Sequence, residues 1–460
     1  MGTTARLPAG FSLALDASVL RPAPLVLVGG APLRVLRLRP AGGRLVDAWT
    51  AGQAVGPGPG EQALARRLLD AGIAHPRPGG GAGWKPGDVT VVVPVRDDHG
   101  GLARTLAALG SGPRVVVVDD GSRAPVRASG AELERRERSQ GPAGARNAGS
   151  RRVATDVVAF VDAGCEPEAG WLTPLLAHLA DPAVGAVAPR IRSKAPAGTP
   201  GWLATYELLR SPLDLGGHES PVRPGATVPY VPTAALVVRR QALLDAGGFD
   251  DSLRFGEDVD FVWRLARRGW RVRYEPAASV SHPARSDAPA WLRQRFEYGL
   301  SAALLAARHG RDVAPLAASP WSVAAWLLVL SGRPWTGAAL AAGTGAALAR
   351  RAGGDRSTAV VLAKLAARGN LGAAASLASA VRRAWLPPAV VTAAATRPAG
   401  TRALAAALTV PAVAEWVERR PGMGPLPWTA LRLADDLAYQ AGVWAGAVRA
   451  RSAACLLPRW

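Results

Sequence analysis

Three short runs of β-branched residues constrain the fold of this chain more than any other feature. They occupy residues 89–95 (VTVVVPV), 115–118 and 157–161, and helix-like sequence separates them. Continuous apolar runs of this length are typical of strands buried on both faces of a sheet. The alternation of strand, helix and strand therefore predicts an α/β domain with parallel strands.

Acidic residues follow these predicted strands directly. Asp119 and Asp120 end the second run, Asp162 ends the third, and a further acidic group, GEDVD, occupies 256–260. In open α/β sheets ligands bind at the carboxyl ends of the strands. An Asp-Gly pair after one strand is also an ordinary turn. Acids at two aligned strand ends, with a third group, favour a functional site.

The first 80 residues have a different texture. Strand-like runs at 25–28 and 33–38 precede a Gly/Pro-rich break at 55–60, and the segment EQALARRLLDAG then has one apolar helical face that stops at Gly72. These elements predict a small winged-helix-like module at 1–80, with no catalytic constellation inside it. A glycine- and proline-rich linker separates it from the next domain.

The C-terminal part, 311–460, is rich in alanine and basic. Residues 313–332 carry no charge, and from residue 301 onward 18 arginine and lysine residues face six acidic ones. A helical subdomain on the anionic cytoplasmic face of a membrane would explain both features. A membrane-spanning helix and a fully soluble subdomain remain alternatives, since Pro315 and Pro320 interrupt the apolar run.

Composition excludes several classes of protein. Two cysteines in 460 residues exclude a disulfide framework and a cysteine-based metal site. The formal net charge of +20 comes almost wholly from dispersed arginines, with which aromatic residues do not interleave. A nucleic-acid partner is therefore not expected.

Five segments resemble glycosyltransferase family 2 in order and spacing. They are VVVPVRDD, VVVVDDGS, GPAGARNAG, VVAFVDAGCEPEAGWL and GGFDDSLRFGEDVDFVWRLARRGWRVRYEP. The resemblance covers about residues 88–310. It implies the GT-A fold, a Rossmann-like mixed sheet with helices on both faces. The flanking segments LVGGAPLRVLRL, ASPWSVAAW and RLADDLAYQAGVWAG are similar to the members of the family that belong to the mycofactocin system.

The resemblance implies a site for a nucleotide sugar. Asp119 is expected to hydrogen-bond the uracil imide, and Arg146 is expected to support the same base. The complete set implied for the donor is Pro94, Val95, Asp119, Asp120, Gly121, Arg146 and Asp162.

A divalent metal, Mg²⁺ or Mn²⁺, is also implied, because such ions bridge carboxylates to diphosphate. Asp162 matches the first position of the Asp-x-Asp motif, but Gly164 stands where the second aspartate is expected. Either Glu166 supplies the second carboxylate or fewer protein ligands hold the ion. His282 matches a histidine that often completes the metal site in relatives.

Asp258 matches the catalytic base of the family, and the like charge of Glu257 is expected to raise its pKa. The alternative is that these acids only stabilise a helix N-terminus, and the two roles are compatible. On the acceptor side we expect Asp260, Arg295 and Tyr298. The Gln-x-x-Arg-Trp motif of processive synthases is not reproduced around 293–299, which disfavours a polymerase with a membrane channel.

The resemblance implies an inverting enzyme that moves glucose from UDP-glucose to the redox cofactor mycofactocin or its precursor, building a short β-glucan chain. The module at 1–80 is then expected to dock the precursor peptide or a maturation enzyme of that pathway. The alternatives are a family 2 enzyme acting on a cell-envelope lipid or glycan, and a non-catalytic protein that binds a nucleotide sugar. From the absence of a secretory signal pattern and from the basic C-terminal part we expect the protein at the cytoplasmic face of the membrane.

Overall fold

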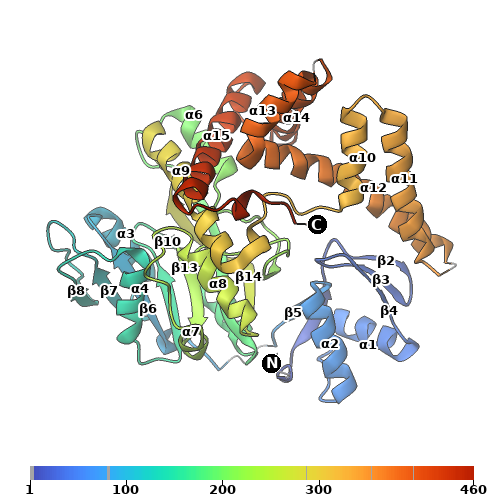
Figure 1. Cartoon of the computed structure of the whole chain (residues 1–460). Helices are drawn as coiled ribbons and strands as arrows, with labels where there is room; N and C mark the ends of the chain where they lie inside the picture. The colour runs from blue at the N-terminus through green and yellow to red at the C-terminus, as the bar shows by residue number, and fades with distance from the viewer. Residues whose placement is uncertain (1–4, 80–82, 286, 354, 397, 460) are drawn as a thin grey trace. The chain divides into compact units, whose positions relative to one another are not determined.

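A computed structural model describes residues 5–79, 83–285, 287–353, 355–396 and 398–459. These residues form two compact units. Unit 1 comprises residues 1–196 and 210–284, and unit 2 comprises residues 197–209 and 285–460 (Figure 1). The helix α9 (Ala288–His309), which the sequence analysis assigned to the catalytic domain, belongs to unit 2.

The centre of unit 1 is a mixed sheet with the strand order β10-β14-β11-β13-β9-β6-β7-β8, and β12 pairs with β14. The three runs predicted from the sequence form β6 (Val89–Val95), β7 (Arg114–Asp119) and β9 (Val157–Val161), and all three are parallel. The remaining strands are β8 (Glu132–Arg135), β10 (Glu166–Pro167), β11 (Val184–Lys194), β12 (Ser220–Val222), β13 (Ala235–Arg239) and β14 (Arg271–Pro283). Because β13 runs antiparallel to β9 and β11, the sheet is mixed, as the resemblance implied.

Helices cover both faces of this sheet. Val89, Val91 and Val93 point into one core with apolar residues of α3 (His99–Leu109) and α5 (Leu172–Leu179). On the other face α4 (Gly141–Arg151) approaches β6 closely, because a Cβ at Gly149 would lie 2.4 Å from Val92 Cγ1. The helices α7 (Arg240–Ala246) and α8 (Glu257–Arg267) complete the domain.

Residues 5–79 fold as a small module within unit 1. The strands β2 (Leu20–Ala23), β3 (Val26–Gly29) and β4 (Arg34–Arg37) form a meander, and β1 (Ser12–Leu15) pairs with β5 (Ala74–Arg77). The helices are α1 (Pro40–Thr50) and α2 (Pro59–Ala71). The predicted helix stop is confirmed, since Gly72 adopts a left-handed conformation with φ of +67°.

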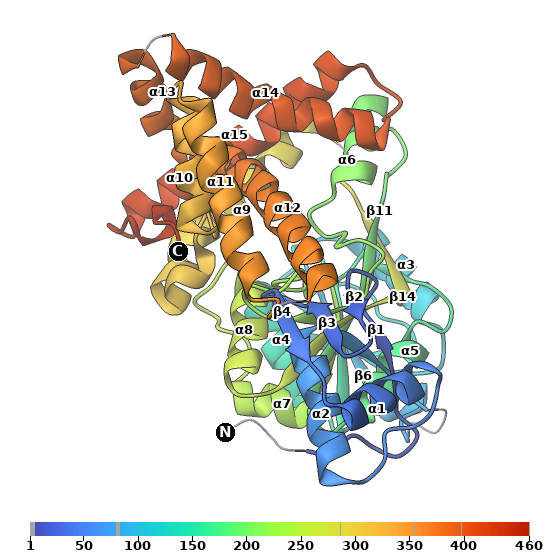
Figure 2. The same cartoon turned by 90° about the vertical axis from the view of Figure 1, so that its right-hand side faces the viewer.

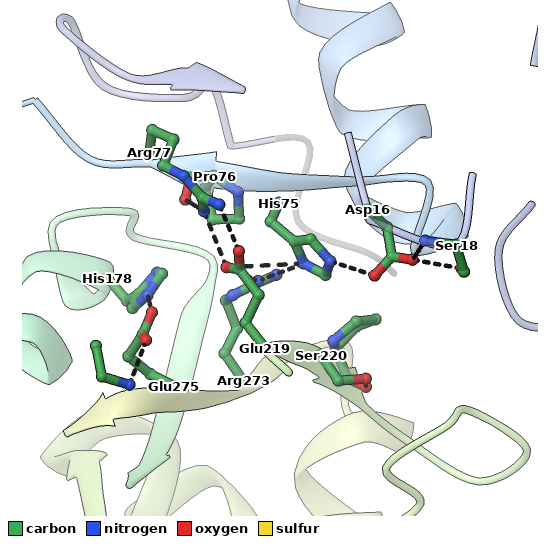
Figure 3. Close-up of polar contacts among 12 residues, drawn as sticks. Asp16, Ser18, His75, Pro76, Arg77, His178, Glu219, Ser220, Arg273 and Glu275 are labelled. Atoms are coloured by element: carbon green, nitrogen blue, oxygen red, sulfur yellow. Dashed lines mark hydrogen bonds and ion pairs between the residues drawn. The ribbon is translucent and has the colours of Figure 1, made fainter. Parts of the chain in front are cut away.

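Ion pairs join this module to the catalytic core. Arg66 in α2 is paired with Asp181 of the core, and Asp70 is paired with Arg271 at the start of β14. Figure 3 shows a third junction, in which His75 of β5 lies between Asp16 on one side and Arg273 and Glu219 on the other. The module therefore belongs to the same compact unit as the sheet.

Unit 2 consists of helices. They are α6 (Gly201–Arg210), α9, α10 (Pro320–Leu330), α11 (Pro334–Arg350), α12 (Arg356–Ala380), α13 (Leu386–Ala395), α14 (Ala399–Arg419) and α15 (Pro425–Arg449). Figure 2 shows α10, α11 and α12 side by side. The uncharged run at 313–332 is broken, because α10 covers only its second half. Within the described ranges, no helix combines the length and apolarity needed to cross a bilayer.

Candidate active site

The carboxyl ends of β6, β7 and β9 meet at one edge of the sheet. Val95 at the end of β6 is the register partner of Asp119 at the end of β7, and Asp162 follows β9 directly. Because β6 lies between β7 and β9, Asp119 and Asp162 are separated by two strand spacings, roughly 10 Å. The structure thus brings the predicted donor-site residues Pro94, Val95, Asp119 and Asp162 to the same edge.

The side chain of Asp119 is fully buried, and its carboxylate already has partners. Its Oδ1 accepts from the backbone N–H of Ser122 at 2.8 Å, and its Oδ2 accepts from Val126 N at 3.3 Å and from Arg135 Nη1 at 2.8 Å. Burial alone would raise the pKa of Asp119, but these hydrogen bonds and the charge of Arg135 outweigh it, so the pKa is lowered. Asp119 therefore shapes the loop after β7, and its predicted contact with a uracil imide stays a prediction.

Asp120 holds the start of α4. Its Oδ2 accepts from Ser139 Oγ at 2.6 Å and from Gly141 N at 2.9 Å, and its Oδ1 accepts from Gln140 N at 3.0 Å. Gly121 follows with φ of +73°, and a Cβ there would lie 2.9 Å from Ser139 N. Asp120 and Gly121 thus keep the loop after β7 against the helix N-terminus, whose N–H groups are suited to bind anions.

Arg146 on α4 is buried between two acids from distant parts of the sequence. Its Nη2 donates to Asp162 Oδ1 at 2.7 Å, and its Nη1 donates to Glu257 Oε1 at 2.9 Å. The guanidinium also lies 5.6 Å from the ring centroid of Phe249. Burial opposes the charged form, but the two carboxylates dominate and raise the pKa of Arg146. Arg146 therefore bridges the end of β9 and the start of α8. It does so with the same guanidinium group that the family resemblance implies for contact with the nucleobase.

Asp258 is half-buried in the first turn of α8, next to the buried Glu257. Gly256 precedes the helix with φ of +79°, and Asp258 Oδ1 accepts from Val259 N at 2.8 Å. Burial and then the charge of Glu257 raise the pKa of Asp258 to about 7. A carboxylate with this pKa is suited to take a proton near neutral pH. The sequence-based expectation that Glu257 raises the pKa of Asp258 is confirmed.

Asp260 lies in the same first turn of α8, two residues after Asp258, and is buried. Its Oδ2 accepts from Arg264 Nε at 2.7 Å, and Arg264 in turn donates to the carbonyl oxygen of Ala246. These contacts tie α8 to the end of α7. Nothing in them supports the predicted acceptor-side role of Asp260, which stays a prediction.

The backbone after β9 explains why no second aspartate follows Asp162. Gly164 has φ of +89°, a region that favours glycine, and a Cβ there would lie 3.2 Å from Pro283 Cγ. Its N–H donates to Thr105 Oγ1 at 2.9 Å, and that hydroxyl donates to the carbonyl oxygen of Cys165 at 2.8 Å. An aspartate at position 164 would be strained in this turn.

The other predicted metal ligands, Glu166 and His282, lie on two paired strands, and Glu166 contacts two cationic side chains. Glu166 Oε2 lies 2.8 Å from Lys194 Nζ, and Glu166 Oε1 lies 3.4 Å from Arg104 Nε. His282 belongs to β14, whose Ser281 is the register partner of Glu166. In the part of the chain that the structure describes, no three His, Cys, Asp or Glu side chains gather as a metal-binding group. Asp162, Glu166 and His282 are thus not assembled around one point.

Comparisons with known proteins identify the family of this chain. The family description "Glycosyl transferase family 2" matches residues 90–243, which run from β6 through α7. The pre-mycofactocin glycosyltransferase of Mycobacterium tuberculosis (strain ATCC 25618 / H37Rv) is 43% identical over 99% of both chains. The chain belongs to glycosyltransferase family 2.

Two further relatives are more distant. Polypeptide N-acetylgalactosaminyltransferase 15 of Mus musculus is 30% identical over 40% of this chain and 34% of its own length. Among solved structures, a mannosyltransferase from Pyrobaculum calidifontis in complex with GDP-Man and Mn²⁺ is 22% identical. It covers 61% of this chain and 79% of its own, with a TM-score of 0.38.

Two residues predicted on the acceptor side of this glycosyltransferase belong to unit 2. Arg295 on α9 is buried, forms an ion pair with Glu207, and places its Nε 3.1 Å from Asp435 Oδ1. Tyr206 donates to the other oxygen of Asp435 at 2.8 Å. Arg295 therefore organises the core of unit 2, and Tyr298, on the same helix, is partly exposed. Their contact with an acceptor stays a prediction.

Sequence reasoning missed two arginines of the site. Arg135 pairs with Asp119, and Arg136 Nη1 lies 3.4 Å from Asp120 Oδ1. The signal for them is the charged run ELERRER at 132–138, which directly precedes the start of α4. Nothing local in this run places two of its arginines against the buried acids after β7.

Proposed function

We propose that this glycosyltransferase moves glucose from UDP-glucose to mycofactocin or its precursor and builds a short β-linked chain. Similarity over the whole length to a pre-mycofactocin glycosyltransferase supports the acceptor. The donor sugar and the chain building rest on the family resemblance. The observation that carries the chemistry is the half-buried Asp258, whose pKa of about 7 suits a base.

In the proposed reaction Asp258 takes the proton of an acceptor hydroxyl. The hydroxyl oxygen attacks C1 of glucose as the bond between C1 and the β-phosphate oxygen breaks. The electron pair of the broken bond leaves with UDP. Attack opposite the leaving group inverts the configuration at C1. A positioned base of this kind contributes roughly 10² to 10⁴ in rate.

Arg146 is a positioning residue in this reaction. Its two hydrogen bonds fix Glu257, the neighbour of the base, and Asp162, at the end of β9. Its positive charge also lowers the pKa of Asp258 and so limits the rise caused by Glu257. The charge of Arg146 thus keeps the proposed base in a useful pH range.

A divalent cation would neutralise charge on the departing diphosphate when bound. Asp162, with a side chain that is 32% exposed, offers an oxygen ligand of the kind that Mg²⁺ and Mn²⁺ prefer. Glu166 and His282 would bind the same ion only if the carboxylate of Glu166 broke its ion pair with Lys194. The residues therefore fit an ion held by Asp162 and by the oxygens of the donor, with fewer protein ligands than Asp-x-Asp provides.

The test is to incubate the purified protein with a panel of UDP-sugars and with mycofactocin precursor, and to follow the acceptor by mass spectrometry. We expect a hexose adduct with UDP-glucose only. Transfer to a lipid or glycan extract in place of the precursor would identify the cell-envelope alternative. If the protein binds the donor but neither transfers the sugar nor hydrolyses the donor when metal is added, it is a non-catalytic binding protein.

Unit 2 is proposed to lie on an anionic membrane surface. Large apolar side chains are exposed on its helices, including Trp335 at 87%, Leu426 at 82% and Val448 at 72%. Arginines from the same part of the chain would pair with acidic headgroups. Release from membranes by carbonate at high pH would support peripheral attachment, and retention until detergent is added would contradict it.

The module at 1–80 is proposed to dock the precursor or a maturation enzyme. Leu20 and Leu33 are exposed beside the β2-β3-β4 meander and could enter such an interface. Because the module is ion-paired to the core, point variants test it better than deletion. Leu33→Asp should weaken acceptor binding and leave UDP binding unchanged, and unchanged acceptor affinity would contradict the proposal.

A further inference from the structure

The carboxylate of Asp98 lies beside the turn that follows β9. Asp98 comes three residues after the end of β6 and is exposed. A Cβ at Gly164 would lie 3.5 Å from Asp98 Oδ2. Gly164 and Asp162 belong to one tight turn, closed by a hydrogen bond from Cys165 N to Asp162 O at 3.0 Å. A carboxylate oxygen from another loop thus reaches the place where the second side chain of an Asp-x-Asp motif would begin.

The start of α3 fixes the position of this carboxylate. Asp98 is the N-cap residue of that helix, and its Oδ1 accepts from Gly101 N at 2.8 Å. The carboxylate lies directly against Gly101, because a Cβ there would overlap Asp98 Oδ2. A larger residue at position 101 would displace the carboxylate, so the glycine makes room for it.

Contacts between α3 and the segment after β9 hold the two loops together. The hydroxyl oxygen of Thr105, which is fully buried, accepts from Gly164 N at 2.9 Å. Arg104 Nε lies 3.4 Å from Glu166 Oε1, and α3 contacts β10 (Figure 1). The approach of Asp98 to Gly164 therefore follows from the packing of these elements.

Asp98 and Asp162 each have one carboxylate oxygen available for a ligand. Oδ1 of Asp162 accepts from Arg146, whereas its Oδ2 accepts no hydrogen bond from the described residues. Oδ1 of Asp98 is used by the helix cap, and within the described ranges its Oδ2 takes part in no hydrogen bond or ion pair. Both side chains are accessible to solvent, and Mg²⁺ and Mn²⁺ prefer oxygen atoms of this kind.

Two carboxylates beside the diphosphate of a donor need a cation between them. The like charges of the acids and of the diphosphate repel one another, and a divalent ion removes this repulsion. The turn after β9 supplies one negative charge, that of Asp162, where an Asp-x-Asp motif would supply two. The loop after β6 offers the other charge next to Gly164.

We propose that Asp98 replaces the missing second aspartate of the metal site. It acts on the ion held by Asp162 through a water molecule bound to that ion, and so adds negative charge without adding a protein ligand. Mg²⁺ usually keeps several of its waters, which lets a neighbouring carboxylate act in this way. The proposal rests on the proposed function, because the ion would bridge Asp162 to the diphosphate of the donor.

The experiment measures Mn²⁺ binding to the full chain by calorimetry in the presence of saturating UDP. Asp98→Asn removes the charge but keeps the cap of α3, because asparagine is as good an N-cap residue as aspartate. Asp355→Asn is the matched control, since Asp355 caps α12 by accepting from the backbone N–H groups of Ser357 and Thr358. UDP binding is also measured with EDTA in place of Mn²⁺, and circular dichroism confirms that both variants are folded.

We expect Asp98→Asn to weaken Mn²⁺ binding by about 10-fold to 100-fold, the range for groups that support a metal from outside its coordination sphere. Asp355→Asn should bind Mn²⁺ as the wild type does, and UDP binding in EDTA should not weaken in either variant. Unchanged Mn²⁺ affinity in Asp98→Asn would overturn the proposal and leave Asp98 as a helix cap. Weaker UDP binding in EDTA would also overturn it, because Asp98 would then contact the nucleotide itself.

Failure of this proposal can be distinguished from failure of the proposed function. A wild-type protein that transfers hexose but binds no Mn²⁺ in the presence of UDP would overturn the role of Asp98 and keep the proposed function. Weaker Mn²⁺ binding in Asp98→Asn, with no hexose transfer by the wild type, would support the role of Asp98 and contradict the proposed function.

Discussion

Arg146 Nη2 donates to Asp162 Oδ1 at 2.7 Å and so joins helix α4 to the end of strand β9. The same guanidinium reaches Glu257 at the start of α8, 111 residues further along the chain. One buried cation thus positions two of the acids on which the proposed chemistry depends.

Removing the cation should destabilise unit 1. Arg146→Met leaves Asp162 and Glu257 without their partner, and the loss of one member of a buried ion pair costs about 3 kcal/mol. We expect a lower free energy of unfolding in urea. Arg146→Lys, which keeps the charge, should lose less. Equal stability of the Met variant and the wild type would show that the bridge contributes nothing.

The pH dependence of turnover should report the pKa of Asp258. Because the base must be ionised, kcat/KM should rise with pH and level off above about 7. Glu257→Gln removes the like charge that raises this pKa, so the rise should move to lower pH. Arg146→Lys keeps a cation and serves as the control. A profile that is the same in the wild type and Glu257→Gln would contradict the assignment.

The junction at His75 should respond to acid. Burial, followed by the charge of Arg273, lowers the pKa of His75 below its usual 6.5. As the pH falls, the unfolded chain therefore binds a proton at His75 before the folded chain does. The contribution of neutral His75 to the stability of the folded state is fully present above pH 6.5 and falls as the pH drops below it. Asp16 and Glu219 face the ring and oppose this shift, while Arg77 pairs with Glu219.

The measurement compares the wild type with His75→Gln in urea unfolding at several pH values between about 8 and about 5. The free-energy difference should shrink as the pH falls. A difference that stays constant across this range would mean that His75 does not titrate differently in the folded and unfolded states.

Introducing a side chain at position 164 should lower the stability of the fold. Gly164 and Gly170 both have positive φ, +89° and +77°, but only Gly164 has an atom within 4 Å of its added Cβ. Gly164→Ala should therefore lower the melting temperature more than Gly170→Ala, whose cost is backbone strain alone, roughly 1–2 kcal/mol. Equal effects in the two variants would mean that the turn after β9 has room for a side chain.

Sequence reasoning found three strands of the core, β6, β7 and β9, because β-branched runs and their acidic ends are local patterns. It also found α2, with its stop at Gly72, and the acidic first turn of α8. It could not find the pairing of Arg146 with Glu257, since nothing local links residues 111 positions apart. For the same reason it could not find that Arg135 and two backbone N–H groups bind the carboxylate of Asp119.

The N-terminal module shows the same limit. The strands β3 and β4 and the helix α2 were predictable from periodicity, but the ion pairs of the module with Asp181, Glu219 and Arg271 depend on which core residues the fold brings to that surface.

The most direct test of the central claim is the Asp258→Asn variant, assayed with UDP-glucose and mycofactocin precursor. The substitution keeps the shape of the side chain and removes its basicity. We predict that hexose transfer, read by mass spectrometry, falls by roughly 10² to 10⁴, while UDP binding measured by calorimetry stays within twofold of the wild type. Undiminished transfer in this variant would contradict the assignment of Asp258 as the base and with it the proposed mechanism.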